Sequence, residues 1–283
     1  VILMIGTDFE GFLRVEGKYI PVPDGLNIGS KYGTHIQLEG GTMHRDNIMV
    51  EICPEPCVLP EEMSSRVSSL IDQAEAHMSG ALGVQAEIAM VPTVKFGAEE
   101  LGGEAAAELG CDRDYLASRG DVIGRLPLNA SMLGKHRCGG GHVHISYGRL
   151  EQVRPALAIH MADLTLGTLE ATMGSQGKRR EYYGMPGLFR PKKYGLIGGV
   201  EYRTPSNLWL ADKESIEAMM TNALSLERVL REEPVDDIMT CITTLWPDLV
   251  AADTFVNEDA GRASTVLATV QDMFPKYEWK VGV

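Results

Sequence analysis

Two histidines that follow a run of glycines mark the stretch of this chain best suited to chemistry. Residues 139–146 read G-G-G-H-V-H-I-S, with His142 and His144 two positions apart. Because side chains on a β-strand alternate between faces, a strand here would project both imidazoles from one face and turn Val143 and Ile145 toward a core. Such a strand is typical of the wall of a metal or phosphate site. It is equally typical of a strand with purely structural histidines, and these eight residues alone favour neither.

Acidic side chains lie on other apolar segments that are predicted to be strands. Asp8 and Glu10 are two positions apart near the start of the chain, Glu51 lies within residues 48–52, and Glu201 lies near the middle of another apolar run. Two carboxylates on one strand face repel each other unless a cation lies between them. Mg²⁺ or Mn²⁺ takes such oxygen ligands. The alternative is a solvent-facing acidic edge, which the strongly apolar surroundings of Asp8 and Glu10 disfavour.

Basic residues could supply the opposite side of such a site. Arg180 and Arg190 lie in a basic segment, residues 177–194, and Arg203 is predicted to share a strand face with Glu201. Guanidinium groups stay charged and bind phosphate or carboxylate with two hydrogen bonds. Divalent ions on one side and arginines on the other would suit phosphoryl transfer. The alternative for the basic segment is a solvated surface loop.

Three common catalytic motifs are absent from the sequence. Residues 174–178, G-S-Q-G-K, are followed by arginine rather than Ser or Thr, so they do not form a Walker A loop. There is also no G-x-S-x-G motif and no H-E-x-x-H motif. Any phosphate would therefore be held by arginines and metal ions.

The elements that must position these residues follow from hydrophobic spacing. Apolar residues at helical spacing predict helices over residues 60–78, 150–173, 212–231, 235–245 and 260–273. Strand-like segments cover residues 2–13, 48–52, 84–96, 139–146 and 196–205. Residues 17–47 predict hairpins and loops, and residues 110–137 predict a long loop without clear periodicity. We expect one domain over residues 1–283, with the chemistry within residues 1–210 and packing helices in residues 211–283.

Composition limits the possible environments and partners. The chain has 283 residues, of which 44% are hydrophobic, and a formal net charge of −13. Such an acidic surface repels a phosphate backbone, which argues against sequence-independent binding of nucleic acid. No apolar run is long enough for a membrane span, and the first ten residues lack the basic flank of a signal peptide. The five irregularly spaced cysteines favour reduced thiols, so we expect a cytoplasmic protein.

Five motifs together resemble the glutamine synthetase and glutamate–cysteine ligase superfamily, and most closely the type 2 carboxylate–amine ligases (amidoligases) of bacteriophages. The resemblance is carried, in the order of that family, by G-T-D-F-E-G-F-L (6–13), D-N-I-M-V-E-I (46–52), G-G-H-V-H-I (140–145), R-R-E-Y-Y-G-M-P-G-L-F-R (179–190) and G-V-E-Y-R-T-P-S-N (199–207). Each motif alone is weak, whereas five in order are fairly specific. The resemblance implies an α+β fold with a curved, mostly antiparallel sheet backed by helices, like the catalytic domain of glutamine synthetase.

The resemblance also implies roles for individual residues. Asp8, His142 and Glu201 resemble the ligands of one divalent ion. Glu10 and Glu51 resemble ligands of a second ion, for which Glu39 is a candidate third ligand despite its unusual spacing. Arg203 resembles the arginine next to the transferred phosphate and the substrate carboxylate. Arg180 and Arg190 resemble arginines that bind the phosphates of the nucleotide and take part in catalysis. His144 could instead contact the nucleotide or the substrate, or support the metal ligands without binding the ion itself.

The implied function is an ATP-dependent carbon–nitrogen ligase that uses two or more Mg²⁺ or Mn²⁺ ions and an acyl-phosphate intermediate. Its substrates would be a small carboxylate and an amine, one of which could be a modified nucleotide or a protein side chain. A phage-encoded enzyme would act in the host cytoplasm, and a homo-oligomer is possible. The alternatives are a small-molecule or guanidino kinase on the same fold, a metal-dependent hydrolase, and a non-catalytic binding protein.

Overall fold

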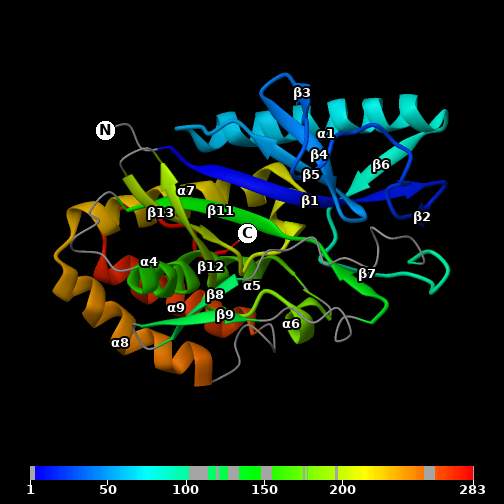
Figure 1. Ribbon diagram of the computed structural model, residues 1–283. Helices are drawn as coiled ribbons and strands as arrows, with labels where there is room; N and C mark the ends of the chain where they lie inside the picture. The colour runs from blue at the N-terminus through cyan, green and yellow to red at the C-terminus, as the bar shows by residue number, and fades with distance from the viewer. Residues whose placement is uncertain are drawn as a thin grey trace.

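A computed structural model describes residues 4–101, 114–118, 121–126, 134–147, 155–174, 176, 178–194, 197–251 and 259–282. A sheet of eleven strands forms its centre (Figure 1). The strand order is β3-β4-β5-β1-β11-β13-β12-β8-β9, and β2 and β6 pair with the far half of β1. All pairings between these strands are antiparallel. This architecture confirms the expected mostly antiparallel sheet with helices.

The strands of this sheet are β1 (Gly6–Val15), β2 (Lys18–Tyr19), β3 (Ile36–Leu38), β4 (Gly41–Asp46), β5 (Met49–Pro54), β6 (Ala86–Ala89), β8 (Asp114–Ser118), β9 (Asp121–Leu126), β11 (Gly141–Ser146), β12 (Leu188–Tyr194) and β13 (Ile197–Tyr202). A separate two-stranded sheet joins β7 (Thr93–Lys95) to β10 (His136–Cys138). The helices are α1 (Pro60–Leu82), α4 (Pro155–Ala162), the π-helical segment η1 (Asp163–Gly167), α5 (Thr168–Met173), α6 (Arg179–Tyr182), the 3₁₀ segment η2 (Asn207–Leu210), α7 (Lys213–Glu232), α8 (Val235–Ala251) and α9 (Ala260–Met273).

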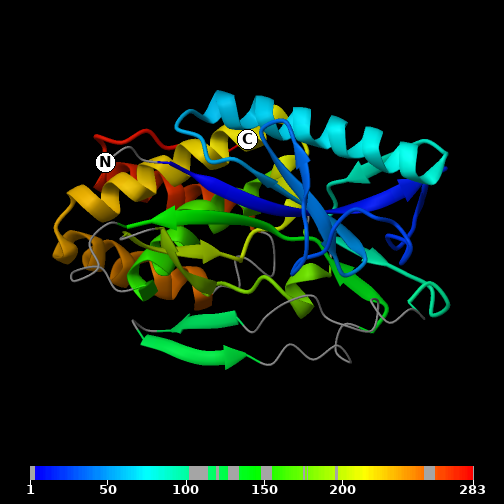
Figure 2. The same cartoon turned by 45° about the horizontal axis from the view of Figure 1, so that its top comes forward.

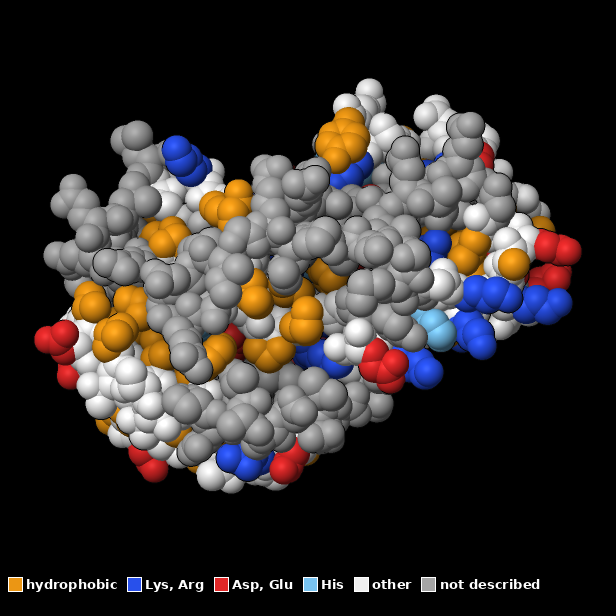
Figure 3. Space-filling model, turned by 60° about the horizontal axis from the view of Figure 1, so that its bottom comes forward, with side chains coloured by type: hydrophobic (Ala, Val, Ile, Leu, Met, Phe, Trp, Pro, Cys, Tyr) orange, Lys and Arg blue, Asp and Glu red, His pale blue; other side chains and the backbone are white. Residues whose placement is uncertain are grey.

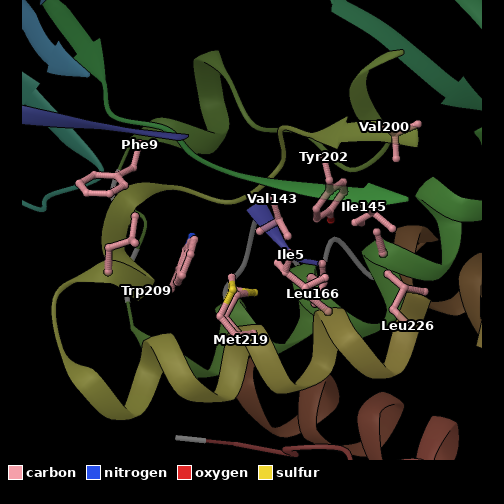
Figure 4. Packing of buried hydrophobic residues seen from close by; sticks show 14 of the residues in the cluster. Ile5, Phe9, Val143, Ile145, Leu166, Val200, Tyr202, Trp209, Met219 and Leu226 are labelled. Atoms are coloured by element: carbon pink, nitrogen blue, oxygen red, sulfur yellow. The ribbon is translucent and has the colours of Figure 1, made fainter. Parts of the chain in front are cut away.

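One face of the sheet packs against helices and forms the main core. In Figure 2, α1 and α7 lie along the same side of β1. Figure 4 shows strand side chains packed against α7, η1 and η2. The labelled residues from the strands and the helical segments are Phe9, Val143, Ile145, Val200, Tyr202, Leu166, Trp209, Met219 and Leu226, and all are buried. Because strand side chains alternate, the polar neighbours of these strand residues lie on the opposite face.

Local signals explain the helix boundaries. Helix α1 has Pro60 in its first turn, where proline is favoured. It is capped at its C-terminal end by Gly83, whose φ of 70° lies in the left-handed region. Helices α7 and α9 each begin after an aspartate, Asp212 and Asp259, whose carboxylate accepts a hydrogen bond from a backbone N–H in the first turn. These capping signals and the apolar spacing confirm the predicted helices over residues 60–78, 212–231 and 260–273.

Two predicted elements differ from those in the structure. The predicted loop over residues 110–137 contains β8 and β9, which pair with an irregular register at the edge of the sheet, and β10, while the remaining residues before Gly134 lie outside those described. The predicted helix over residues 150–173 is helical from Pro155 onward, with a π-helical segment inside it, and residues 150–154 lie outside the described part. Short edge strands with mixed polarity have a weak sequence pattern, which is why β8 and β9 read as a loop.

The described residues include no helix with the length and apolarity needed to cross a bilayer.

Candidate active site

The strand register brings the predicted acidic and histidine residues onto the sheet face opposite the helices. Asp8 pairs with His142 across β1 and β11, and His144 pairs with Glu201 across β11 and β13. On the other side of β1, Glu10 pairs with Glu51 of β5, and Glu51 in turn pairs with His44 of β4. Residues directly opposite each other in an antiparallel pair share a face. Two adjacent polar clusters therefore lie side by side on this face.

The first cluster consists of Asp8, His142 and Glu201. One potential ligand atom from each residue lies within 4.8 Å of the others. Nδ1 of His142 is 2.8 Å from Oδ1 of Asp8 and 3.8 Å from Oε1 of Glu201. The side chains of His142 and Glu201 are 4% and 1% exposed, and that of Asp8 is 14% exposed. A buried imidazole next to two carboxylates is a donor set that fits a divalent cation.

The glycine run before β11 sets the orientation of the His142 ring. A side chain at Gly140 would place its Cβ 2.4 Å from Nε2 of His142, so only glycine leaves room for the ring there. With Nε2 packed against Gly140, Nδ1 faces the two carboxylates. The N–H of Gly140 also donates a hydrogen bond of 2.8 Å to Oε2 of Glu10. The glycines thus position residues of both clusters.

Three cationic side chains surround Glu201. Arg203 forms a hydrogen-bonded ion pair with Oε1, Lys192 Nζ lies 2.5 Å from Oε2, and Arg190 Nη1 lies 3.6 Å from Oε1. Burial and the charge of Asp8 act to raise the pKa of Glu201, but Arg203, His142 and Lys192 outweigh them and lower it to about 2. Glu201 is therefore an ionised carboxylate at any working pH.

Arg203 is held firmly at the edge of the first cluster. Its side chain is 3% exposed, its Nε donates to the Tyr183 hydroxyl at 2.7 Å, and its Nη1 lies 3.1 Å from Nδ1 of His142. Burial of Asp8 favours its neutral form, yet the neighbouring His144 and His142 lower the Asp8 pKa well below its usual range. The first cluster is thus a compact set of charges in which two carboxylates stay ionised.

The second cluster contains Glu10, Glu51, His44 and Asp46. Nε2 of His44 lies 3.2 Å from Oε2 of Glu51, but without hydrogen-bond geometry. Neither ring nitrogen of His44 has a hydrogen-bond partner among the described residues, although its side chain is only 4% exposed. Buried polar atoms are normally hydrogen-bonded, so these nitrogens are available to a water molecule or a ligand. Asp46 accepts a hydrogen bond of 2.7 Å from Lys31.

The carboxylates of the second cluster lack enough positive charge around them. Burial, with the charges of Asp8 and Asp46, raises the pKa of Glu51 to about 8. Burial also raises the pKa of Glu10, an effect that His142 opposes and that Asp46 strengthens. Burial lowers the pKa of His44, which favours the neutral imidazole that binds metals. Carboxylate oxygens and a neutral imidazole are donor types that Mg²⁺ or Mn²⁺ accepts, but among the described residues only Asp8, His142 and Glu201 bring three ligand atoms within 4.8 Å of one another.

His44, Asp46 and Lys31 are site residues that the sequence did not predict, and Lys192 lies in the predicted basic segment but was not assigned to the site. His44 and Asp46 belong to residues 17–47, which predict hairpins and loops. Their signal is the alternation in T-M-H-R-D, followed by a two-residue turn at Asn47, whose φ of 57° is left-handed. That turn pairs Asp46 with Met49 and so places His44 opposite Glu51.

Glu39 does not join the second cluster. It is exposed in the turn between β3 and β4, and its backbone N–H and C=O bond to the Gln73 side chain of α1 at 2.8 and 3.1 Å. Its suggested role as the third ligand is therefore not supported, because His44 occupies the place next to Glu51. His144 lies between the first cluster and a cavity, with Nε2 3.3 Å from Oδ2 of Asp8.

Arg180 lies apart from both clusters, and its predicted role in phosphate binding is not supported. The residue is 5% exposed, and it donates to the carbonyls of Gly184 and Thr204 and to Oε2 of Glu170 at 2.6 Å. Glu170 is fully buried and also accepts hydrogen bonds from Ser206. These contacts make Arg180 a structural residue that fixes the chain just after Arg203.

Arg180→Met is expected to lower the free energy of unfolding by ~3–5 kcal/mol, because Glu170 would remain buried without its cation. Urea denaturation measures this change. The matched control is Arg14→Met, which removes an ion pair to Glu87 whose side chains are 41% and 44% exposed, and which should cost at most ~1 kcal/mol. Unchanged stability of Arg180→Met together with weaker ATP binding would restore Arg180 to the phosphate site.

The acidic surface is uneven. On the face in Figure 3, basic side chains gather at the right-hand end beside a histidine, although the whole chain carries a net charge of −13. The expectation that the protein does not bind nucleic acid without regard to sequence stays a prediction.

Residues 128–239 match the family model described as "Phage phiEco32-like COOH.NH2 ligase-type 2". The matched part contains His142, Arg190, Glu201 and Arg203, whereas Asp8, Glu10 and Glu51 precede it. The match supports a carboxylate–amine ligase family and confirms the resemblance over this part of the chain. No curated protein matches the chain.

Proposed function

We propose that this protein is an ATP-dependent carboxylate–amine ligase that activates a carboxylate as an acyl phosphate. One observation carries the proposal: the buried Asp8–His142–Glu201 cluster lies beside Arg203 and next to a second acidic cluster on one sheet face. The family match, which includes His142, Glu201 and Arg203, supports the same reaction class. We also propose that residues 1–283 form one domain of the glutamine synthetase type.

The two clusters divide the ligand roles. Asp8, His142 and Glu201 would hold one Mg²⁺ or Mn²⁺ ion, and Glu10, Glu51 and His44 would hold a second. Bound divalent ions would neutralise charge on the phosphates, so that ATP and an anionic carboxylate can approach each other.

Cationic side chains next to the two clusters would bind and stabilise the phosphates of ATP. Arg203, oriented by Tyr183 and Glu201, would donate hydrogen bonds to the phosphoryl group during transfer. Arg190 and Lys192 of β12 lie on the same face and would bind phosphate oxygens of ATP. Because guanidinium remains charged, Arg203 keeps this role across the whole working pH range.

The proposed reaction has two steps. An oxygen of the substrate carboxylate attacks the γ-phosphorus of ATP, the bond to the β-phosphate oxygen breaks, and ADP leaves. The nitrogen of the amine then attacks the acyl carbon, the bond to the phosphate oxygen breaks, and the amine loses a proton. The products are an amide, ADP and inorganic phosphate.

A substrate screen tests the proposal. The protein is incubated with ATP, MgCl₂ and pairs of carboxylates and amines, and phosphate release and product mass are measured. We expect phosphate release that requires both substrates, and its loss on adding EDTA. A kinase would instead form ADP and a stable phosphorylated product without an amine, and a hydrolase would act without ATP. Hydrolysis without ATP, or no binding of Mg²⁺–ATP, would overturn the proposal.

A further inference from the structure

A cavity of about 240 Å³ adjoins the first cluster at His144. Among the residues that the structure describes, it is also lined by Met4, Gly6, Pro56, Ser146, Ile197 and Arg231. These residues come from the start of β1, the ends of β11 and α7, the start of β13 and the segment after β5. The views agree that the start of β1 and the end of α7 lie at the same end of the molecule (Figures 1 and 2).

The cavity has a charged end and an apolar wall. Arg231 has no carboxylate within 4.0 Å among the described residues, and its buried Nε has no hydrogen-bond partner among them. Its Nη2 donates to the Ser146 hydroxyl at 2.6 Å. Glu227, one turn earlier on α7, attracts Arg231 electrostatically but forms no ion pair with it, so the guanidinium fork remains suited to binding a carboxylate. Met4, Pro56 and Ile197 supply the apolar wall.

A buried glutamate fixes this charged end. Glu227, which is fully buried, lies one helical turn before Arg231 on α7 and accepts a hydrogen bond of 2.5 Å from the N–H of Ser146. It thereby ties α7 to the end of β11 and holds Ser146 and Arg231 together. The arrangement is a built recess rather than a surface basic residue beside a chance hollow.

The size of the cavity selects among ligands. Pockets for drug-sized ligands span roughly 300–1,000 Å³, so this cavity is too small for a nucleotide and fits a molecule of amino-acid size. The occupant needs a carboxylate for Arg231 and an apolar group for the wall. It also needs a polar group that points past His144 toward Asp8, which lies 3.3 Å from the ring.

We propose that this cavity binds a small apolar α-amino acid, with its carboxylate on Arg231 and Ser146 and its amino group toward His144. If the ligase function holds, this amino acid is the amine substrate, and that assignment rests on the proposed function. The binding preference of the cavity does not depend on it.

The test is calorimetric binding to the full chain, with and without Mg²⁺ and a non-hydrolysable ATP analogue. The probes are leucine, valine and phenylalanine, the charged amino acids glutamate and lysine, and isoamylamine, which is leucine without its carboxylate. We expect an apolar amino acid to bind, and isoamylamine to bind at least tenfold more weakly. The same compounds, supplied as amines in the phosphate-release assay, should follow the same order.

Two variants and a control locate the binding. Arg231→Met should weaken binding of the amino acid at least tenfold, and Ile197→Phe should do so by filling the cavity. Arg228→Met removes an exposed arginine one turn away on the same helix and should leave binding unchanged. The proposal is overturned if no apolar amino acid binds, or if both variants bind as the wild type does. If binding follows these expectations but ATP is not consumed, the cavity assignment stands and the ligase function fails.

Discussion

Replacing Glu201 by glutamine is expected to lower ATP turnover by ~10²–10³-fold, the scale seen when one group that stabilises transition-state charge is removed. Glu201 contributes an ionised oxygen to the first cluster, since its pKa lies near 2, and an amide cannot replace that charge. The loss has a second consequence. Arg203, Lys192 and Arg190 would remain without their common counter-ion, and their positive charge would oppose a divalent ion at the same place.

The variant should remain folded, because the glutamine oxygen can still accept a hydrogen bond from Arg203 and Asp8 stays nearby. Turnover and thermal unfolding are measured together with binding of Mn²⁺ by electron paramagnetic resonance. Glu87→Gln is the control: it also removes a strand glutamate paired with an arginine, but on the exposed edge of the sheet. Wild-type turnover in Glu201→Gln would remove Glu201 from the metal site.

The sequence predicted best those features that depend on neighbouring residues. The predicted helix over residues 260–273 coincides with α9, because its apolar spacing lies within the helix and its cap, Asp259, directly precedes it. The shared face of His142 and His144 follows in the same way from strand alternation alone. Such signals need no information about the rest of the chain.

The features that the sequence did not predict depend on contacts between distant segments of the chain. His44 becomes a site residue only because β4 pairs with β5, and a short strand among glycines and prolines gives little sign of that pairing. Arg180 reads as part of a basic segment, and nothing in the segment indicates that Glu170 is buried next to it. The cavity draws on residues from Met4 to Arg231, so no single motif could have predicted it.

Raising the pH is expected to destabilise the metal-free protein, and Glu51 should account for much of the effect. Its pKa rises from the usual 4.5 to about 8 in the folded state, chiefly through burial, so the folded state binds this proton more tightly than the unfolded state does. The contribution of Glu51 to the free energy of unfolding is therefore greatest below pH 4.5, and it falls as the pH rises to about 8. Between pH 6 and 8 the loss is ~2 kcal/mol.

Other groups also titrate in this range, so the test compares variants. Burial raises the pKa of Asp163 to about 6 and that of Glu227 to about 7, and both act in the same direction as Glu51 at lower pH. Urea denaturation in EDTA at pH 6, 7 and 8 should give a steep decline for the wild type and for Glu87→Gln. Glu51→Gln should flatten the decline, because a neutral amide has no proton to lose.

Magnesium should reverse this dependence, because a cation between Glu10, Glu51 and His44 favours the ionised carboxylates. If binding releases the one proton held by Glu51, the Kd for Mg²⁺ should fall about tenfold per pH unit up to pH 8. The stabilisation by Mg²⁺ should grow accordingly, and both trends should weaken in Glu51→Gln. Stability that does not change between pH 6 and 8, with a constant Kd, would mean that Glu51 is already ionised and balanced by charge without the ion. The second cluster would then be a structural part of the sheet, and the proposed reaction would depend on the first cluster alone.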